Sequence, residues 1–208
     1  MPGSRSGWIW CSGAILLILV FVGAARACDL PPPPRVSAPR QIFRLDQTKS
    51  LVRFDAKAFL HDVSGKTSKI QGTIRLADQE HLSDAEGCIR IDAASLETGA
   101  RARDAIMRGD HLETHKYPTI AFDLTQVEQA RPVAGGWEFV ARGLLTLHGV
   151  SREMPLAIRG RRDGEAVRLS GEVAVKMSDH QIPTPTLLFL AVEDQVVVHF
   201  DVTALRTP

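Results

Sequence analysis

Apolar and polar residues alternate along most of the chain beyond residue 40, and this alternation constrains the fold more than any other feature. In the run from Trp137 to Leu147, every second residue is apolar or glycine. Successive side chains of a β-strand point to opposite faces, so a period of two predicts half-buried strands. Turn signals such as Asp163-Gly164 favour hairpins between neighbouring strands. The pattern therefore predicts an all-β domain with antiparallel pairing.

The expected strands are numerous and of regular length. Many strands in one sheet tend to curl and close, because closure removes unpaired edges. A barrel is therefore favoured over a sandwich, although alternation alone allows both. Polar or proline-containing connections are expected at 77–85, 128–136 and 178–187, with a turn at 193–194. The expected strands are 42–45, 52–58, 66–76, 88–93, 119–124, 137–147, 150–158, 166–176, 188–192 and 196–205.

One helical insertion interrupts the strands between Ser95 and Phe122. Residues 100–108 are rich in Ala, Arg and Met, which lose little rotamer freedom in a helix. Gly109-Asp110 is expected to break this helix, with a second short turn as one continuation, and Tyr117-Pro118 is expected to return the chain to extended backbone. A short helical insertion in an otherwise all-strand domain is expected to plug or cover one end of the sheet.

Several small residues fall on faces predicted to point inward. They leave room inside a barrel, or they only permit strand coiling and bulges. The sequence supports both interpretations equally. These residues are Ala56, Ala58, Gly72, Ala141 and Gly143.

The N-terminal region predicts export. Residues 14–23 form a short apolar run, and Ala25-Arg26-Ala27 resembles a signal-peptidase site, so residues 1–27 are interpreted as a signal peptide. An uncleaved anchor is the alternative, since residues 8–25 carry no charge. Residues 28–40 then form a proline-rich linker, and 41–208 form the domain. The expected location is periplasmic or secreted.

Cys28, directly after this site, has three interpretations. It is a lipidated first residue, which would anchor the protein to a membrane; it pairs with Cys88 in an oxidising compartment; or it is free. Membrane association through lipidated Cys28 or an uncleaved anchor thus stays open, as does the oligomeric state, for which a dimer is one option.

Charge and motif content exclude several function classes. The chain has 25 Lys and Arg against 24 Asp and Glu, and removal of residues 1–27 takes away two arginines, which leaves a net charge of about −1. This balance offers no footprint for nucleic acid. No nucleophile elbow, phosphate loop or C-x-x-C occurs. We therefore expect no enzyme, no catalytic residue and no cofactor.

The seven histidines do not form a recognisable metal site. His111 and His115 have the i, i+4 spacing of helical metal ligands, but no third ligand accompanies them. His61, His81 and His180 fall in expected loops and are predicted to be solvated. The prediction is that no metal is bound.

Arg101, Arg103 and Asp104 adjoin the expected helix and have two interpretations. The arginines form a cationic rim that holds a polar head group at a barrel mouth. Alternatively, Arg103 and Asp104 form a local clamp between helix and strand, and this second interpretation is favoured.

With these residues laid out, the chain resembles the YceI-like family of exported lipid-binding proteins over about residues 43–205. The similarity is distributed along the chain, and the order and spacing of its parts make it specific. A departure from the family pattern lies at 178–185, where SDHQIPTP replaces an aromatic and glycine-rich segment. The residues that carry the resemblance are Asp46, Ser50, Phe54, Gly65, Gly72, Ser95, Thr98-Gly99, Arg103-Asp104, Tyr117-Pro118, Ile120, Phe122, Gly143, Leu145 and the run LHGVSR at 147–152.

The resemblance implies an extended, lipocalin-like antiparallel β-barrel whose apolar interior holds a long polyisoprenoid chain, such as a quinone tail or an isoprenoid phosphate. It also implies an exported bacterial protein of the cell envelope that binds, stores or transports this lipid without catalysis. The candidate tube-lining residues are Phe54, Ile74, Ile91, Phe122, Phe139, Leu145, Val173 and Val198.

Two alternative functions belong to other classes. An exported hydrolase or isomerase would use the barrel as a reaction pocket, with His148, Asp104 or Arg103 as candidate residues. An envelope stress factor would act through its surface instead.

Overall fold

The computed structural model describes residues 28, 30, 40–59, 61–77, 82–184, 186–187 and 190–207. The predicted signal peptide at 1–27, most of the predicted linker and His81 lie outside these residues. The described elements are β1 (Gln41–Leu45), β2 (Leu51–Ala58), β3 (Val63–Thr67), β4 (Ile70–Leu76), β5 (Glu86–Asp92), α1 (Arg101–Ile106), β6 (Thr119–Val133), β7 (Gly136–Leu147), β8 (Val150–Asp163), β9 (Ala166–Lys176), β10 (Thr186–Leu187) and β11 (Leu190–Thr207), with short turns η1 (Gln47–Lys49), η2 (Leu82–Asp84), η3 (Ala93–Ser95), η4 (Met107–His111) and η5 (Ser178–His180).

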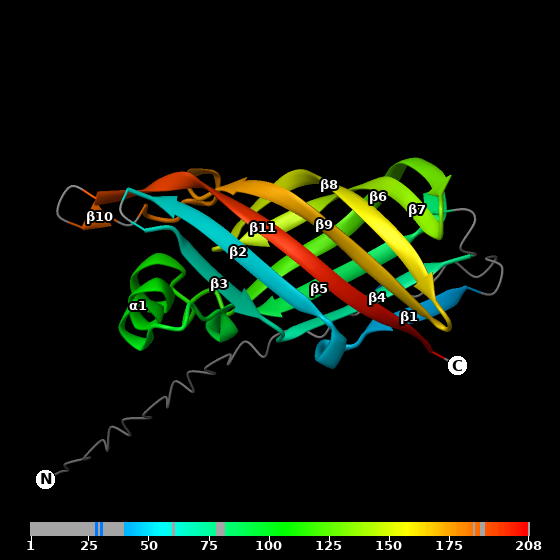
Figure 1. The fold of residues 1–208 in the computed structure, drawn as a ribbon, viewed down its shortest axis with the longest axis horizontal. Coiled ribbons are helices and arrows are strands. Elements are labelled where there is room, and N and C mark those ends of the chain that lie inside the picture. The colour runs from blue at the N-terminus through cyan, green and yellow to red at the C-terminus, as the bar shows by residue number, and fades with distance from the viewer. Residues whose placement is uncertain are drawn as a thin grey trace, which may run out of the picture.

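The strands close into an elongated antiparallel barrel, as predicted (Figure 1). The sheet runs β1-β4-β5-β6-β7-β8-β9-β11, and β1 pairs with β11 to complete a circle of eight strands in the described part of the chain. Strand β11 pairs with β9 along one edge and with β2 and then β1 along the other. Closure therefore depends on the pairing of residues 42–45 with residues 204–207, near the two ends of the domain.

The two ends of the barrel differ. Helix α1 lies at one end, beside β3, together with the β7–β8 turn (Figure 1). We refer to this end as the helix end. The turns at residues 134–135 and 164–165, between β6 and β7 and between β8 and β9, lie at the opposite end, the hairpin end. The predicted insertion thus covers part of one end only.

The strand predicted at 66–76 is two strands. Strand β3 pairs with β2, whereas β4 pairs with β1 and β5, so the chain changes partners at Ser68-Lys69. Thr67 stabilises this change, because its hydroxyl accepts from the Lys69 N–H at 3.0 Å and lies 2.6 Å from the Ser95 hydroxyl. Side-chain hydrogen bonds of this kind compete with continued strand pairing.

The prediction of a loop at 128–136 is also wrong. Strand β6 continues to Val133 and forms a tight hairpin with β7. Two register shifts, one of them between Glu128 and Arg131 next to Gln129 at φ +53°, insert extra residues into β6. Bulges of this type keep a strand paired where simple alternation fails. The turn predicted at 193–194 is likewise a bulge, within a continuous β11.

The helical insertion is confirmed, but Gly109-Asp110 does not end it. A single π-helical turn, η4, follows α1 and extends the helical backbone to His111. Arg108 joins this turn to the segment after η3, because its guanidinium donates to the Leu96 carbonyl at 3.1 and 2.7 Å.

The inward-facing glycines are covered by neighbouring side chains. A Cβ atom at Gly143 would lie 2.3 Å from Cζ of Phe122, and one at Gly72 would lie 2.7 Å from Cδ1 of Leu45. The space that these glycines leave is therefore filled by a ring or an aliphatic side chain from an adjacent strand. Of the five small residues singled out from the sequence, only Ala141 lines a cavity.

Cys28 and Cys88 form a disulfide with Cα atoms 5.8 Å apart. Cys88 is buried, so the segment before β1 is joined covalently to β5. Because the sulfur of Cys28 is bonded to Cys88, it is not available for lipidation in this structure. Among the described residues, no helix has the length and apolar character needed to span a membrane.

Candidate functional site

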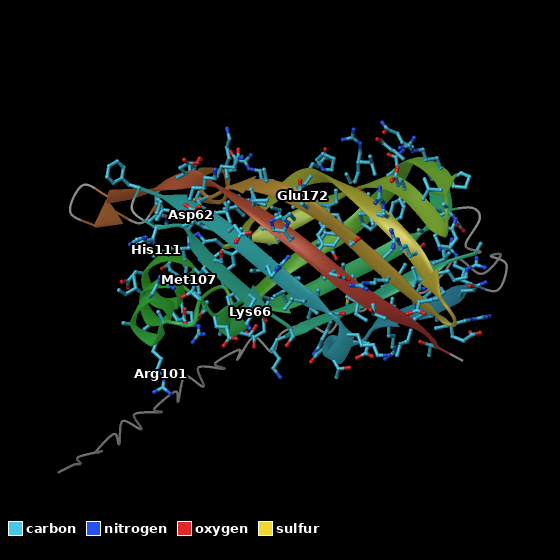
Figure 2. The ribbon with its side chains drawn as sticks, in the orientation of Figure 1. Asp62, Lys66, Arg101, Met107, His111 and Glu172 are labelled. Carbon is cyan, nitrogen blue, oxygen red and sulfur yellow. A yellow bond between two sulfur atoms is a disulfide. The ribbon has the colours of Figure 1, made fainter. Side chains whose placement is uncertain are left out.

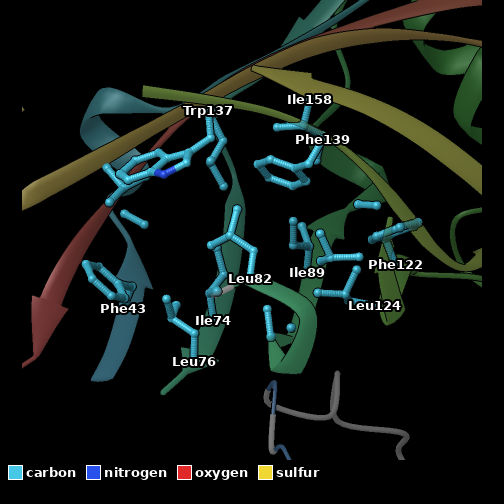
Figure 3. A pocket seen from close by; sticks show the side chains of 17 residues that line it. Phe43, Ile74, Leu76, Leu82, Ile89, Phe122, Leu124, Trp137, Phe139 and Ile158 are labelled. Atoms are coloured by element: carbon cyan, nitrogen blue, oxygen red, sulfur yellow. The ribbon is translucent and has the colours of Figure 1, made fainter. Parts of the chain in front are cut away.

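An apolar cavity lies inside the hairpin half of the barrel. Its volume is about 100 Å³, and the side chains around it are all apolar (Figure 3). They come from all eight barrel strands, with Ala204 from β11, together with two residues of the β4–β5 connection. The lining residues are Phe43, Ile74, Leu76, Leu82, Ala85, Gly87, Ile89, Phe122, Leu124, Val127, Trp137, Phe139, Ala141, Ile158, Val167, Leu169 and Ala204.

Strand register explains why these side chains meet. Directly opposed residues of an antiparallel pair face the same side of the sheet. Phe122 is opposite Ile89 on one neighbour and Leu145 on the other, and Phe139 is opposite Ile158. The alternation in sequence therefore becomes a continuous apolar inner wall.

A closely packed cluster lies beside the cavity toward the middle of the barrel. Val52, Ile70 and Val202 are almost fully buried, and Ile89, Leu169 and Phe200 pack against them. Ile89 and Leu169 also line the cavity, so the cluster borders it directly. The cavity therefore has a packed floor on the side of the helix end.

Three of the eight predicted tube residues line this cavity: Ile74, Phe122 and Phe139. The other five are half-buried, and strand register places them on the inner face nearer the helix end. Val198, for example, is opposite both Phe54 and Val173. A role for all eight in contacting a ligand stays a prediction. The five are Phe54, Ile91, Leu145, Val173 and Val198.

Sequence reasoning missed two cavity residues in the β4–β5 connection, which it treated as purely polar. Leu82 and Ala85 pack with the buried cluster of Phe43, Leu76 and Ala204. The signal for Leu82 was available, since it is the one large apolar residue between Ala77 and Ala85. An isolated apolar residue in a polar segment does not reveal where it packs, however.

The predicted head-group rim lies at the other end from the cavity. Arg103 donates to the Thr98 hydroxyl at 2.8 Å and to the Thr98 carbonyl at 3.1 Å. Arg101 points away from the barrel into solvent (Figure 2). The structure thus favours the local-clamp interpretation of this stretch.

Asp104 completes the clamp. Its carboxylate accepts from the Thr98 N–H at 2.8 Å and from the Thr98 hydroxyl at 2.5 Å. These hydrogen bonds, the one from the hydroxyl above all, hold the pKa of Asp104 below its usual range. Asp104 is buried, and its Oδ1 accepts both of these hydrogen bonds, which is the environment of a structural group.

His148, a candidate for catalysis in the alternative hypothesis, is buried in a hydrogen-bonded cluster. Its Nε2 lies 2.9 Å from a Glu113 carboxylate oxygen, and its Nδ1 lies 3.1 Å from the His180 carbonyl. The Tyr117 ring meets it edge-on with centroids 4.5 Å apart. Both ring nitrogens are therefore engaged in joining the β7–β8 turn to the insertion and to η5.

The prediction that His180 is solvated is wrong. Only 1% of its surface is exposed, and its Nδ1 lies 3.0 Å from the Val150 carbonyl. The turn η5 packs this ring against the start of β8 rather than leaving it in solvent. No local pattern in the sequence predicts that packing. The other two loop histidines differ: His61 is exposed, and His81 lies outside the described residues.

The cavity offers an apolar ligand burial and little else. Its lining side chains carry no group that could act as a nucleophile or general base, and the polar clusters described above lie at the helix end. Within the described residues, no group of three or more His, Cys, Asp or Glu side chains could hold a metal ion.

Comparison with known proteins identifies the domain. The model of the YceI-like domain matches residues 43–204. The structure is similar to that of BcnA from Burkholderia cenocepacia, with a TM-score of 0.67 and 21% identity, covering 76% of this chain and 98% of that one. No curated protein matches the sequence.

Two further structures share the fold. A polyisoprenoid-binding domain from Saccharophagus degradans, implicated in plant cell wall breakdown, has a TM-score of 0.60 and 17% identity, with 79% of this chain and 98% of that one covered. The YceI protein of Campylobacter jejuni has a TM-score of 0.59 and 20% identity over 72% of this chain and 88% of that one. Since the family model spans more than three quarters of the sequence, the chain belongs to the YceI-like family.

Proposed function

We propose that this protein binds a long-chain polyisoprenoid lipid inside its barrel and stores or carries it without chemical change. The observation that carries the proposal is the cavity enclosed by apolar side chains alone. An isoprenoid chain has almost no hydrogen-bonding groups, so its site needs apolar surface and no polar partners. The similar polyisoprenoid-binding domain from Saccharophagus degradans supports the same ligand class.

The energetics favour such a ligand. Each buried methylene contributes roughly 0.8 kcal/mol, so an isoprene unit of five carbons contributes about 4 kcal/mol. A cavity of about 100 Å³ accommodates only a small part of a long chain. A longer tail would have to part the packed cluster of Val52, Ile70 and Val202 to reach the helix end, where Phe54, Leu145 and Val173 face inward and are only half-buried. Movement of these side chains is part of the proposal.

The proposed location is outside the cytoplasm. The Cys28–Cys88 disulfide supports it, because disulfides persist mainly in oxidising compartments. The apolar segment at 14–23 supports it independently. In this proposal, residues 1–27 direct export and Cys28 remains without lipid.

Native mass spectrometry of the purified protein, followed by denaturation, tests the ligand directly. We expect a released species with the mass of an isoprenoid quinone or a polyprenyl compound. The protein should also take up an added isoprenoid after delipidation. A bare polypeptide mass together with no uptake of any added isoprenoid would contradict the proposal.

A further inference from the structure

We infer that the mouth of the cavity at the hairpin end is built to hold an anionic head group, so that the preferred ligand is an isoprenoid phosphate rather than a neutral quinone. This inference rests on the proposed function and names the ligand within it. The residues that carry it are Arg162 of β8 and Arg206 of β11.

Register places both arginines on the inner side of the barrel wall. Arg162 is directly opposite Val167, and Arg206 is directly opposite Phe43. Val167 and Phe43 both line the cavity. Because directly opposed residues share a face, each arginine lies on the cavity-lining face, level with a lining residue near the hairpin end.

Arg162 is held against the cavity wall by an aromatic ring. Its guanidinium carbon lies 5.4 Å from the centroid of the Trp137 indole, and Trp137 lines the cavity (Figure 3). This cation–π contact orients the guanidinium while leaving its N–H donors free. The arrangement therefore presents donors at the point where an apolar chain inside the cavity would end.

Neither arginine is neutralised within the described part of the chain. No described carboxylate lies within ion-pair distance of Arg162 or Arg206, and both side chains are exposed. By contrast, Arg131 and Arg159 pair with Glu138, and Arg168 pairs with Asp201. Arg161 and Arg44, which face outward, also form no ion pair in the described part of the chain, so what distinguishes Arg162 and Arg206 is their place on the inner face.

The two cations can reach one anion. Two strand spacings of about 4.8 Å and two residues of about 3.3 Å separate their Cα atoms along the sheet. Two arginine side chains can close this distance from opposite sides. Asp163 and Glu165 of the β8–β9 hairpin are nearby acids; both are exposed, and neither is within ion-pair distance of either guanidinium. Arginine forks match phosphate oxygens in geometry and charge.

A pair of probes with one tail and two heads tests the inference. Geranylgeraniol and geranylgeranyl monophosphate would be titrated into the delipidated full-length protein below their micelle concentrations, with calorimetry as the readout. We expect the phosphate to bind at least tenfold more tightly than the alcohol. This preference should shrink as salt rises from 50 to 500 mM, because salt screens exposed charges.

Charge-removing variants locate the head group. Arg162→Gln and Arg206→Gln should each weaken phosphate binding three- to tenfold without changing alcohol binding, and the double variant should lose the preference. Arg168→Gln removes the same charge from the outer face of β9 and should leave the preference intact. Circular dichroism melting would verify that all variants fold.

The possible outcomes distinguish a failure of the head-group inference from a failure of the proposed lipid-binding function. Equal binding of the two probes, a preference that survives in the double variant, or a preference abolished by Arg101→Gln or Arg103→Gln instead would each overturn the inference and leave lipid binding standing. Binding of neither probe would overturn both.

Discussion

Ala141→Leu should stabilise the empty protein and abolish lipid binding. Ala141 is 2% exposed and lines the cavity. A cavity of about 100 Å³ costs roughly 2.4 kcal/mol at about 24 cal/mol per Å³. The three added carbons of leucine contribute about 2.4 kcal/mol at roughly 0.8 kcal/mol each. The two estimates describe the same gain in different ways and are not added.

Ordering the leucine side chain costs about 0.5–1 kcal/mol, which leaves a net gain of about 1.5 kcal/mol. For a domain of this size, that gain raises the Tm by about 3–6 °C. Urea unfolding and thermal melts of delipidated protein would measure it, and repeats with added isoprenoid would measure ligand stabilisation. We expect the ligand to stabilise the wild type but not the variant.

Ala157→Leu is the matched control. Ala157 lies on β8 and is exposed, so the same three carbons are added to the outer surface. This variant should show no comparable gain and should still be stabilised by the ligand. The reasoning would be refuted if Ala141→Leu bound the isoprenoid as tightly as wild type, since the cavity would then not be the site.

Three further predictions concern stability. Loss of the disulfide, which spans 60 residues, should lower the free energy of unfolding by up to about 4 kcal/mol, measured by guanidinium unfolding with and without reductant; a change below about 1 kcal/mol would contradict this. Asp104→Ala should destabilise the protein at neutral pH. Because the folded-state pKa of Asp104 is lowered, its contribution is lost as the pH falls through that value, so variant and wild type should converge in acid melts. Gly143→Ala should cost about 1–3 kcal/mol, because its Cβ would lie 2.3 Å from the Phe122 ring, whereas Gly109→Ala meets no atom within 4 Å and should not.

The strands could be predicted because alternation is a local property that burial of one face imposes. β9 was predicted with its observed bounds, 166–176, and β7 to within one residue. The failures occurred where a strand bends without ending. Bulges near Gln129 and between Val192 and Val196 interrupt the alternation while pairing continues, and the sequence shows the interruption but not the pairing.

The inner face could be predicted in part, because a period of two separates two faces. All eight tube candidates lie on the face that points into the barrel, and three of them line the cavity. Alternation carries no information on position along the barrel axis, however. Whether Phe122 or Leu145 borders empty space depends on which side chains fill the adjacent glycine positions, and that is set by pairing between distant segments.

The same limit explains why sequence reasoning singled out arginines that lie at the other end from the cavity. Arg101 and Arg103 stand out in the sequence because they lie in the segment that interrupts the strands. The Arg103 guanidinium, however, donates hydrogen bonds to Thr98. Arg162 and Arg206 are inconspicuous in the sequence. Each comes just after a strand predicted from alternation, at 150–158 and 196–205, and resembles any solvated arginine near a strand end. Only register shows that they continue the faces of Val167 and Phe43.

The contrast between the two ends gives the barrel a direction. At the helix end, polar side chains bond to one another or to backbone across separate elements, as His148 does with Glu113 and with the His180 carbonyl. Opening that end would leave buried polar groups unpaired, at a cost of about 1–3 kcal/mol each. At the hairpin end, Leu82 and Ala85 cover the cavity by apolar contacts, and ion pairs of Arg40 with Asp84 and Glu86 hold the connection that carries them. Arg162 and Arg206 have no described carboxylate within ion-pair distance. Partly exposed ion pairs of this kind contribute only about 0–1 kcal/mol each, and a lipid entering there restores the apolar burial that it displaces. If the protein carries an isoprenoid as proposed, we expect exchange through the hairpin end, with the tail entering first and the head group remaining beside the two arginines.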